Sequence, residues 1–476
     1  MEMTGKPRRG AASFLLRRLS SSQVLLAEIV LLAAAMRFFK LGEWSFWIDE
    51  VYTVNKAMAV WGNPSPTTPL SLLLTGGALG VLGVDEWNAR LASSLIGIAS
   101  IPVLYFPIRR LFGTPVALLS ALLLAISPWH LHWSQNARFY TALMLFYSLS
   151  LFAFYLWLES DRFRYLAASA VLLWLAYLER MMAAVLVPVV AVYLAALYVF
   201  PLGRPSGWRR ANLALLALPV ALAGVHQAYA VGFQGLPPFY AGFIETFAGY
   251  THNPVRVLLS AVYDVGLPLF LLALVGGTYL VLQRSRAGLL LLIGALLPLA
   301  LLVAGAPFLQ TFSRYVFHTL PCWIVLAAVA VERLSAHVRG HASVLVFGVL
   351  LLVVADAASQ DVLYYVYQNG NREDWKGAFA QVQQRRLPGD VVVTTRPEVA
   401  GYYLGEDATW TQGLQPEQVV SAGRRSWFVI DNRTGFVSPE LQSWLEEETR
   451  LVAVRDVNLP GKTFMMRVYL YDPERP

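Results

Sequence analysis

The chain has 476 residues, a mean hydropathy of +0.52 and only 14% charged side chains, which excludes an ordinary soluble protein. Its net charge of +7 is spread over short Lys and Arg clusters between long apolar runs. That pattern is typical of a multi-pass membrane protein and does not indicate a nucleic-acid surface. The single cysteine, Cys322, excludes an internal disulfide, and no Cys/His group resembles a zinc site.

The first apolar run follows a basic N-terminus, as in a secretory signal, and Ala33-Ala34-Ala35 would then be the cleavage site. We reject this interpretation because Glu28 and Arg37 make the run more polar than a signal core. The multispanning remainder also needs no removable signal. Residues 23–41 are therefore predicted as a first span, with the N-terminus in the cytoplasm.

Eleven apolar runs are candidate membrane spans, at about 23–41, 88–108, 114–129, 139–157, 164–178, 181–201, 211–229, 255–281, 287–305, 315–334 and 342–358. A further run at 68–83 is assigned to the membrane surface, because every arginine-rich linker then becomes cytoplasmic and the C-terminus lies outside. Residues 164–178 and 181–201 are the weakest of these candidates, and we expect two short or broken helices that meet at Glu179-Arg180.

The first outer loop, residues 42–87, contains the stretch Phe46–Thr53, with the adjacent carboxylates Asp49 and Glu50 between bulky aromatic residues. Near low dielectric, one carboxylate of such a pair tends to keep its charge and the other to resist it. This situation suits a general base or a cation ligand. The alternative is that Asp49 only caps the helix that follows.

The other outer segments also collect polar and aromatic residues. They are 129–138 (WHLHWSQNAR, followed by Phe139-Tyr140), the Glu179-Arg180 turn, 230–254 with its Gly, Pro and aromatic residues, and the segment around Gln310–Tyr315. The inner segments carry little beyond arginine. We therefore expect any chemistry to take place on the outer face.

The composition changes after residue 358, which predicts a membrane domain at 1–358 and a small extracytoplasmic α/β domain at 359–476. Its expected elements are a helix from Asp374 to Arg386, a turn at 388–390, buried strands at 391–394 and 426–430, a helix at 438–448 capped by Ser438, and paired strands at 450–456 and 463–471. The domain lacks a glycine-rich phosphate loop. We expect it to contact an acceptor or simply to cap the membrane part.

Three motifs, in this order, resemble those of the GT-C class of integral membrane glycosyltransferases. They read Trp47–Thr53 (WIDEVYT), Ser134–Tyr140 (SQNARFY), and Ser313-Arg314-Tyr315 followed by Leu320-Pro321. The likeness is greatest to the protein O-mannosyltransferase / aminoarabinose transferase superfamily, in its bacterial family 39-like branch, and it covers nearly the whole chain. It implies a GT-C fold with about 11 transmembrane helices and juxtamembrane helices in the first outer loop.

The resemblance also implies an inverting glycosyltransferase that moves a hexosyl or pentosyl group from a polyprenyl-phosphate donor to an acceptor hydroxyl on a lipid, glycan or protein. The reaction would take place at the outer face of the cytoplasmic membrane. Asp49 would be the general base and Glu50 would hold the sugar or neighbouring acceptor groups. Arg138 and Arg314 would neutralise the departing lipid phosphate, a task for which a guanidinium fork is well shaped.

The remaining expected site residues each have a plainer interpretation. Tyr140 and Tyr315 would support the donor phosphate or merely belong to the aromatic belt. Arg138 and Arg314 would otherwise only snorkel to outer headgroups. The substrate cavity would include Glu179, Arg180, His130, His132 and Gln135. The two histidines, flanked by tryptophans, would otherwise be interfacial anchors, and Glu179-Arg180 a structural ion pair.

Two positions depart from related sequences, which often carry an acid where Asn136 stands and a histidine where Glu179 stands. A divalent metal would need several oxygen ligands, for which Asp49, Glu50 and Glu179 are the outer candidates, with His130 and His132 as further donors. The missing acid at 136 makes us favour metal-independent chemistry, with no cofactor and no assigned metal ligand.

Two other functions remain as alternatives: a transporter or flippase of lipid-linked sugars, and a glycan polymerase or ligase of related architecture. A transporter favours paired inverted repeats, and the two halves of the sequence show no such similarity. A polymerase or ligase usually has one large outer loop late in the chain. The leading hypothesis requires the acidic doublet, Arg138 and Arg314 to converge in one non-cytoplasmic cavity.

Overall fold

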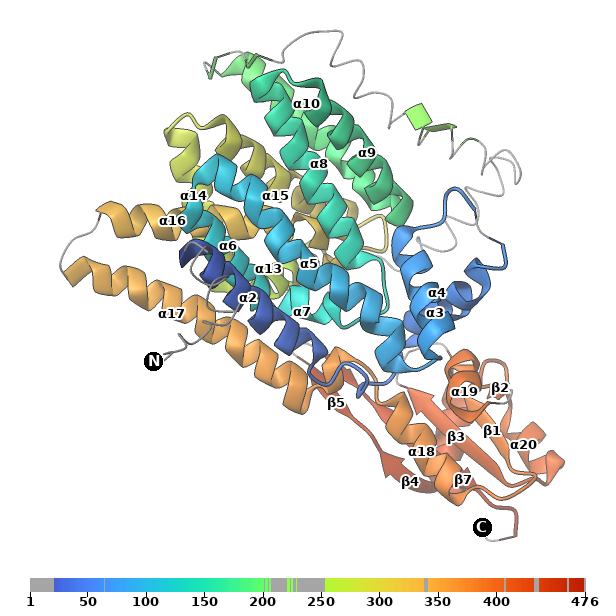
Figure 1. The fold of residues 1–476 in the computed structure, drawn as a ribbon. Coiled ribbons are helices and arrows are strands. Elements are labelled where there is room, and N and C mark those ends of the chain that lie inside the picture. Colours follow the sequence, from blue (N-terminus) through green and yellow to red (C-terminus); the bar gives the residue numbers. More distant parts are fainter. Residues whose placement is uncertain are drawn as a thin grey trace, which may run out of the picture. The chain divides into compact units, whose positions relative to one another are not determined.

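A computed structural model describes residues 21–63, 65–200, 253–337, 341–405, 408–431, 436–459 and 462–474, with a few isolated positions between 202 and 228 (Figure 1). The chain divides into two compact units. The first, which we call the helical unit, comprises residues 1–36, 96–131 and 143–355. The second, the mixed unit, comprises residues 37–95, 132–142 and 356–476.

The helical unit is organised around one buried helix, α16 (Leu320–His337), in which every residue from Leu320 to Val331 is buried. Helices α6, α14 and α15 pack against it, as an apolar surface on all sides of a helix requires. The helices that lie wholly or partly in this unit are α2 (Ser21–Phe38), α5 (Glu86–Phe112), α6 (Thr114–Ala125), α7 (Pro128–Ser134), α8 (Tyr140–Ser160), α9 (Phe163–Glu179), η1 (Met181–Val185), α10 (Leu186–Val199), α13 (Pro254–Val265), α14 (Leu267–Leu282), α15 (Arg286–Gly305), η2 (Ser313–Thr319), α16 and α17 (His341–Val362).

Within the described residues, seven helices are long and apolar enough to cross a membrane, or up to nine if each of two bent pairs forms one span. The total of 11 stays a prediction, because the run at 211–229 and nearly all of the outer segment 230–254 lie outside the described residues. The predicted span at 255–281 is wrong as a single helix: α13 and α14 are bent by 91° where Gly266 separates them.

Two other features of the helices agree with the predictions from the sequence. The helix predicted to break at Glu179-Arg180 does so, because α9 ends at Glu179 and Arg180 has extended backbone angles. The apolar run at 68–83 forms helix α4 (Leu70–Leu82), whose 13 residues are too few to span a bilayer at 1.5 Å per residue.

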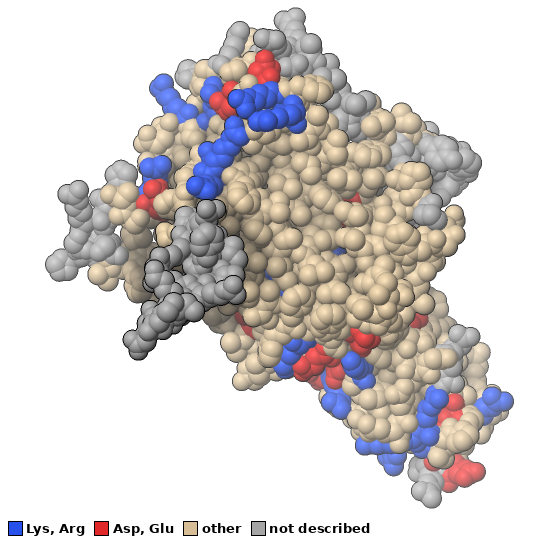
Figure 2. Space-filling view, viewed as in Figure 1, with Lys and Arg blue, Asp and Glu red and all other residues tan. Residues whose placement is uncertain are grey.

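The arginine-rich linkers of the helical unit meet on one side of it. Arg110 and Arg164 both donate to the Tyr165 hydroxyl, at 2.5 and 3.2 Å, and Arg286 pairs with Glu159 at 2.6 Å. Figure 2 shows Lys and Arg gathered at one end of the helices and a broad uncharged surface beside them. The linkers that contain Arg110, Arg164 and Arg286 therefore lie on one side, as their common assignment to the cytoplasm requires.

The mixed unit contains a five-stranded sheet of order β2-β1-β3-β7-β4. Strands β2 and β3 run parallel to β1, and β7 runs antiparallel to β3 and β4. Its elements are α3 (Ile48–Val60), α4, η3 (Leu363–Tyr367), η4 (Asn369–Asn371), α18 (Trp375–Arg385), β1 (Val391–Thr394), α19 (Pro397–Leu404), β2 (Thr409–Trp410), α20 (Pro416–Ala422), β3 (Ser426–Asp431), α21 (Pro439–Glu448), β4 (Arg450–Val454), β5 (Val457–Leu459), β6 (Lys462–Phe464) and β7 (Met466–Tyr471).

The sheet is covered on both faces, because side chains alternate along each strand. Trp427 and Val429 of β3 pack in one cluster with α18, α19 and α3, whereas Phe428 and Ile430 pack with α20 and α21. Both faces of β3 are therefore apolar, and the strand reads as an uninterrupted hydrophobic run.

The predicted elements after residue 374 are confirmed, except that the strand predicted at 463–471 is divided into β6 and β7, of which only β7 pairs with β4. Asp374 caps α18 by accepting from Gly377 N at 2.9 Å, and Ser438 caps α21 by accepting from Leu441 N at 3.1 Å. The two helices expected in the first outer loop are α3 and α4. The domain boundary at 358/359 stays a prediction, since the structure groups residues 356–476 with that loop and with residues 132–142.

We predict that Gly276→Ala destabilises the helical unit by about 1–3 kcal/mol through overpacking. A Cβ at Gly276 of α14 would lie 1.9 Å from the Leu326 carbonyl oxygen of α16, so the two backbones would have to separate. Thermal unfolding in detergent measures this. Gly348→Ala in α17 is the control, because a Cβ there would meet nothing within 4 Å. Its melting temperature should be unchanged or slightly higher, since alanine favours a helix more than glycine does. Equal effects of the two changes would contradict the packing described here.

Candidate functional site

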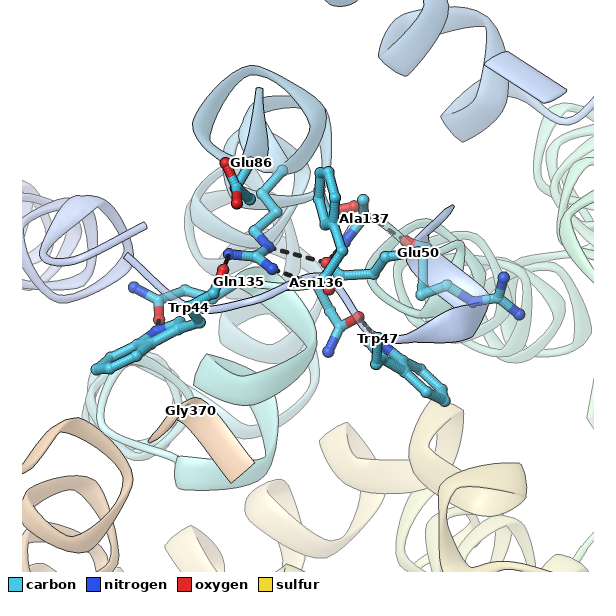
Figure 3. A network of polar contacts seen from close by, with 12 residues as sticks. Trp44, Trp47, Glu50, Glu86, Gln135, Asn136, Ala137 and Gly370 are labelled. Atoms are coloured by element: carbon cyan, nitrogen blue, oxygen red, sulfur yellow. Dashed lines mark hydrogen bonds and ion pairs between the residues drawn. The ribbon is translucent and has the colours of Figure 1, made fainter. Parts of the chain in front are cut away.

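The carboxylate of Glu50 is fully buried in the mixed unit, between two arginines. Figure 3 shows Glu50 within the surrounding network of polar contacts. Arg90 donates from Nε to Oε1 at 2.8 Å and from Nη2 to Oε2 at 2.9 Å. Arg372 donates from Nη1 to Oε2 at 3.0 Å, and the backbone N–H of Ala137 donates to Oε1 at 2.8 Å. We call Glu50, Arg90 and Arg372 the buried ion cluster.

The cluster is stable because its remaining donors also have partners. Arg90 donates to the carbonyls of Leu41, Trp44 and Ser45, and Arg372 donates to those of Gly370 and Gln135. A buried charge group of this kind is tolerated only when its hydrogen bonds are complete. The cluster therefore fixes the first outer loop, the start of α5, the turn after α7 and the segment before α18 against one another.

The two arginines also set the protonation of Glu50. Burial would raise the pKa of its carboxyl, but the neighbouring charges of Arg90 and Arg372 and the hydrogen bonds hold the pKa below its ordinary value of 4.5. Glu50 is therefore an anion, and both of its carboxylate oxygens accept hydrogen bonds from the protein. Because no solvent reaches this carboxylate, these contacts support a structural role, and the prediction that Glu50 holds the sugar or neighbouring acceptor groups stays a prediction.

The carboxylate of the adjacent Asp49 is 31% exposed and lies beside Arg138. Arg138 Nη2 is 3.5 Å from Asp49 Oδ2, and Arg138 Nη1 donates to the Asp49 carbonyl at 2.8 Å and to Thr53 Oγ1 at 2.9 Å. The capping alternative is wrong, because α3 begins at Ile48 and its N-cap is Trp47, which makes no side-chain cap. Asp49 thus presents a carboxylate to solvent from a fixed backbone.

Gln135 and Asn136 hold the two outer segments together. The Gln135 amide oxygen accepts from Trp44 Nε1 and the Tyr364 hydroxyl, and its nitrogen donates to the Arg37 and Phe39 carbonyls. These hydrogen bonds and the burial of Gln135 support a structural role, and its assignment to the substrate cavity stays a prediction. Asn136 accepts from Trp47 Nε1 at 2.9 Å.

Two other predicted residues of the mixed unit lie among aromatic rings. Tyr140 is buried, with its ring 3.8 Å from that of Trp133 and 4.3 Å from that of Phe139. His132 contacts Trp133 and Tyr364 edge to face, at 4.6 and 6.0 Å. These contacts fit the aromatic interpretation of both residues, and a substrate role for them stays a prediction.

The other predicted site residues belong to the helical unit. His130 is buried, with Nε2 3.2 Å from Ser100 Oγ and its ring stacked on Phe317. Glu179 is buried at the end of α9, whereas Arg180 is exposed. The Arg314 guanidinium lies over the rings of Phe312, at 4.5 Å, and Tyr315, at 5.7 Å.

A cavity of about 390 Å³ opens beside the Arg314-Tyr315 motif. Its lining is mostly apolar and includes Met181, Val185, Leu301, Leu302, Tyr315 and His318. His318 and Thr311, which also line it, are buried, and neither ring nitrogen of His318 nor the Thr311 hydroxyl has a hydrogen-bond partner in the described part of the chain. The cavity suits an amphiphile with a long apolar part and a few polar groups.

Asp49, Arg138 and the buried ion cluster thus belong to the mixed unit, and Arg314, Glu179 and His130 to the helical unit. Their convergence in one cavity stays a prediction. Among the described residues, no three His, Cys, Asp or Glu side chains gather as metal ligands.

Sequence reasoning missed Arg90 and Arg372. Arg90 had a recognisable signal, because it is an ionisable residue inside a predicted span and such residues are functional or paired by default. Arg372 stands in a polar stretch, Asn369–Lys376, where nothing local distinguishes a buried guanidinium from an exposed one.

Comparison with known proteins agrees with this architecture. Residues 65–226, about a third of the chain, match the family model described as dolichyl-phosphate-mannose-protein mannosyltransferase. The fold is similar to that of ArnT from Cupriavidus metallidurans bound to undecaprenyl phosphate, with a TM-score of 0.62, 17% identity and coverage of 97% of this chain and 98% of that chain. The chain has the GT-C fold.

The apo structure of the same ArnT gives a TM-score of 0.61 at 18% identity, with 95% and 98% of the two chains covered. The Archaeoglobus fulgidus oligosaccharyltransferase AglB, in complex with an inhibitory peptide and a dolichol-phosphate, gives 0.56 at 12% identity, covering 92% of this chain and 74% of that chain. No curated protein matches the sequence. The resemblance inferred from the three motifs is confirmed, and the chain is a multi-pass membrane protein.

We predict that Glu50→Gln destabilises the protein by about 3–5 kcal/mol, because it leaves two buried guanidiniums without a counter-charge. Thermal or denaturant unfolding in detergent measures the loss. Glu43→Gln is the matched control, since the Glu43 side chain is 52% exposed and its pairing with Lys40 contributes little. If both variants unfold alike, the cluster does not hold the unit together.

The stability that the buried ion cluster contributes should also depend on pH. Because the pKa of folded Glu50 lies below 4.5, its contribution to stability is present at neutral pH and is lost as the pH falls through the lowered pKa. Melting temperatures measured at decreasing pH should therefore fall more steeply for the wild type than for Glu50→Gln below about pH 4.5. Parallel curves would show that Glu50 is not an anion in the folded state.

Proposed function

We propose that the protein is an inverting glycosyltransferase that moves a hexosyl or pentosyl group from a polyprenyl-phosphate donor to an acceptor hydroxyl. The observation that carries the proposal is the unequal use of two adjacent carboxylates. Glu50 is enclosed in the buried ion cluster, whereas Asp49 is partly exposed and lies beside Arg138. A fold likeness alone would not assign an activity, because one fold supports many functions.

In this proposal Asp49 takes the proton from the acceptor hydroxyl as that oxygen attacks the anomeric carbon. A general base must lie within hydrogen-bond reach of the proton it removes, and Asp49 is fixed by two contacts to Arg138 and by the Thr53 hydroxyl. Glu50 contributes indirectly, by fixing the first turn of α3 through the buried ion cluster.

The donor lipid would bind to the helical unit. The apolar cavity beside Tyr315 suits a prenyl chain, and Arg314 would neutralise the phosphate as the glycosidic bond breaks. Arg138 is assigned the same task by resemblance, but its contacts support the positioning of Asp49 more directly. No step in this proposal requires a cofactor or a metal ion.

The comparisons support the choice of donor class. The ArnT structure contains undecaprenyl phosphate, and the AglB structure contains a dolichol-phosphate with a peptide. Multi-pass topology and arginine linkers on one side fit a cytoplasmic-membrane protein with an inner N-terminus and an extracytoplasmic C-terminal domain. A lipid, glycan or protein would be the acceptor.

We predict that Asp49→Asn lowers the rate of sugar transfer at least about 100-fold, while binding of undecaprenyl phosphate and the melting temperature change little. Transfer is measured with purified protein, a polyprenyl-phosphate sugar and membrane-fraction acceptors. Glu43→Gln, another exposed carboxylate of the first outer loop, is the control and should keep its activity.

Full transfer by Asp49→Asn would reject the base assignment. A flippase would behave differently again: it would tolerate Asp49→Asn and move the lipid-linked sugar across vesicle membranes without forming a new glycosidic bond.

A further inference from the structure

The three parallel strands of the mixed unit end in a group of polar and aromatic residues. The chain leaves β1 for β2 on one side and then returns to β3 on the other side. In open α/β sheets, ligands bind beyond the carboxyl ends of the strands, where the order reverses in this way. Here Arg396 follows β1, Trp410 ends β2 and Asp431 ends β3.

These residues form a compact surface with an exposed ring. The Arg396 guanidinium lies 4.7 Å from the centre of the Phe436 ring, and its Nε is 3.9 Å from Asp431 Oδ2. The Trp410 ring is 5.9 Å from that of Phe436 and is 47% exposed. We call Arg396, Trp410 and Phe436 the aromatic shelf.

Hydrogen bonds join the strand ends beneath the aromatic shelf. Thr394 Oγ1 donates to the Val429 carbonyl at 2.8 Å, and Thr395 Oγ1 accepts from Asp431 N at 3.2 Å. The backbone N–H of Thr411, next to Trp410, donates to the Thr394 carbonyl at 3.2 Å. The Thr411 hydroxyl itself is buried and has no hydrogen-bond partner among the described residues. The strand ends are thus fixed before any ligand arrives.

The shelf is connected to the helix that carries the proposed base. Glu398, two residues after Arg396, accepts from the Tyr52 hydroxyl at 3.0 Å. Tyr52 stands three residues after Asp49 on α3, so the two side chains lie about one helical turn apart. A molecule that rests on the shelf would therefore extend toward the face of α3 that presents Asp49.

We infer that the aromatic shelf binds sugar rings of the acceptor, which would accordingly be a glycan chain; this inference rests on the proposed function. A sugar has an apolar C–H face, which matches an exposed tryptophan ring, and hydroxyl edges, which match a guanidinium fork and carboxylates. The charges disfavour an anionic headgroup, because the guanidinium of Arg396 already faces the carboxylate of Asp431. A neutral or weakly cationic glycan fits best.

Binding to the full-length protein in detergent tests the shelf without any turnover. The probes are neutral linear tetrasaccharides derived from mannan, glucan and galactan, titrated calorimetrically. We expect at least one to bind, Trp410→Ala to weaken that binding about tenfold, and Trp410→Phe to retain most of it. Leu451→Ala is the matched control, since Leu451 is 50% exposed on the edge strand β4.

The inference is overturned if no tetrasaccharide binds to the wild type at millimolar concentration, or if Trp410→Ala and Leu451→Ala bind alike. Melting temperatures confirm that each variant is folded. Asp49→Asn should bind the tetrasaccharide like the wild type. A failure of the proposed function, seen as full transfer by Asp49→Asn, is therefore distinguishable from a failure of the shelf, seen in these binding curves.

Discussion

The mixed unit depends on one ionic arrangement, in which Glu50 is enclosed between Arg90 and Arg372. An isolated buried carboxylate is costly, and so is each buried guanidinium. The three are tolerated together because every oxygen of Glu50 accepts a hydrogen bond and the spare donors of the arginines reach backbone carbonyls. Residues that are 322 positions apart in the sequence are thereby joined in one interaction.

This arrangement explains why two neighbouring carboxylates differ in burial and in their contacts. Successive residues of a helix point about 100° apart, and here Glu50 faces the interior whereas the Asp49 carboxylate is 31% exposed. Arg138 then contacts Asp49, and it can do so because the cluster also binds Ala137 N and the Gln135 carbonyl, just before Arg138 in the chain. The structural anion thus sets the position of the exposed one, and the proposed chemistry depends on both.

The sequence predicted well whatever is decided locally. The caps Asp374 and Ser438, the strands 391–394 and 426–430, and the break at Glu179-Arg180 follow from capping, alternation and the cost of charges in lipid. The sequence predicted the pair of adjacent carboxylates but not the burial of Glu50, because that burial depends on Arg90 and Arg372, which are distant in the sequence. The bend between α13 and α14 was missed for a similar reason: one apolar run fits a straight span and two bent helices equally well.

The most direct test of this account is a structure of the protein with a non-hydrolysable polyprenyl-phosphate sugar and an acceptor glycan. The account predicts the acceptor hydroxyl within hydrogen-bond distance of the Asp49 carboxylate, with Glu50 still enclosed by Arg90 and Arg372. A complex in which Glu50 leaves its arginines to contact the sugar, while Asp49 faces bulk solvent, would contradict it.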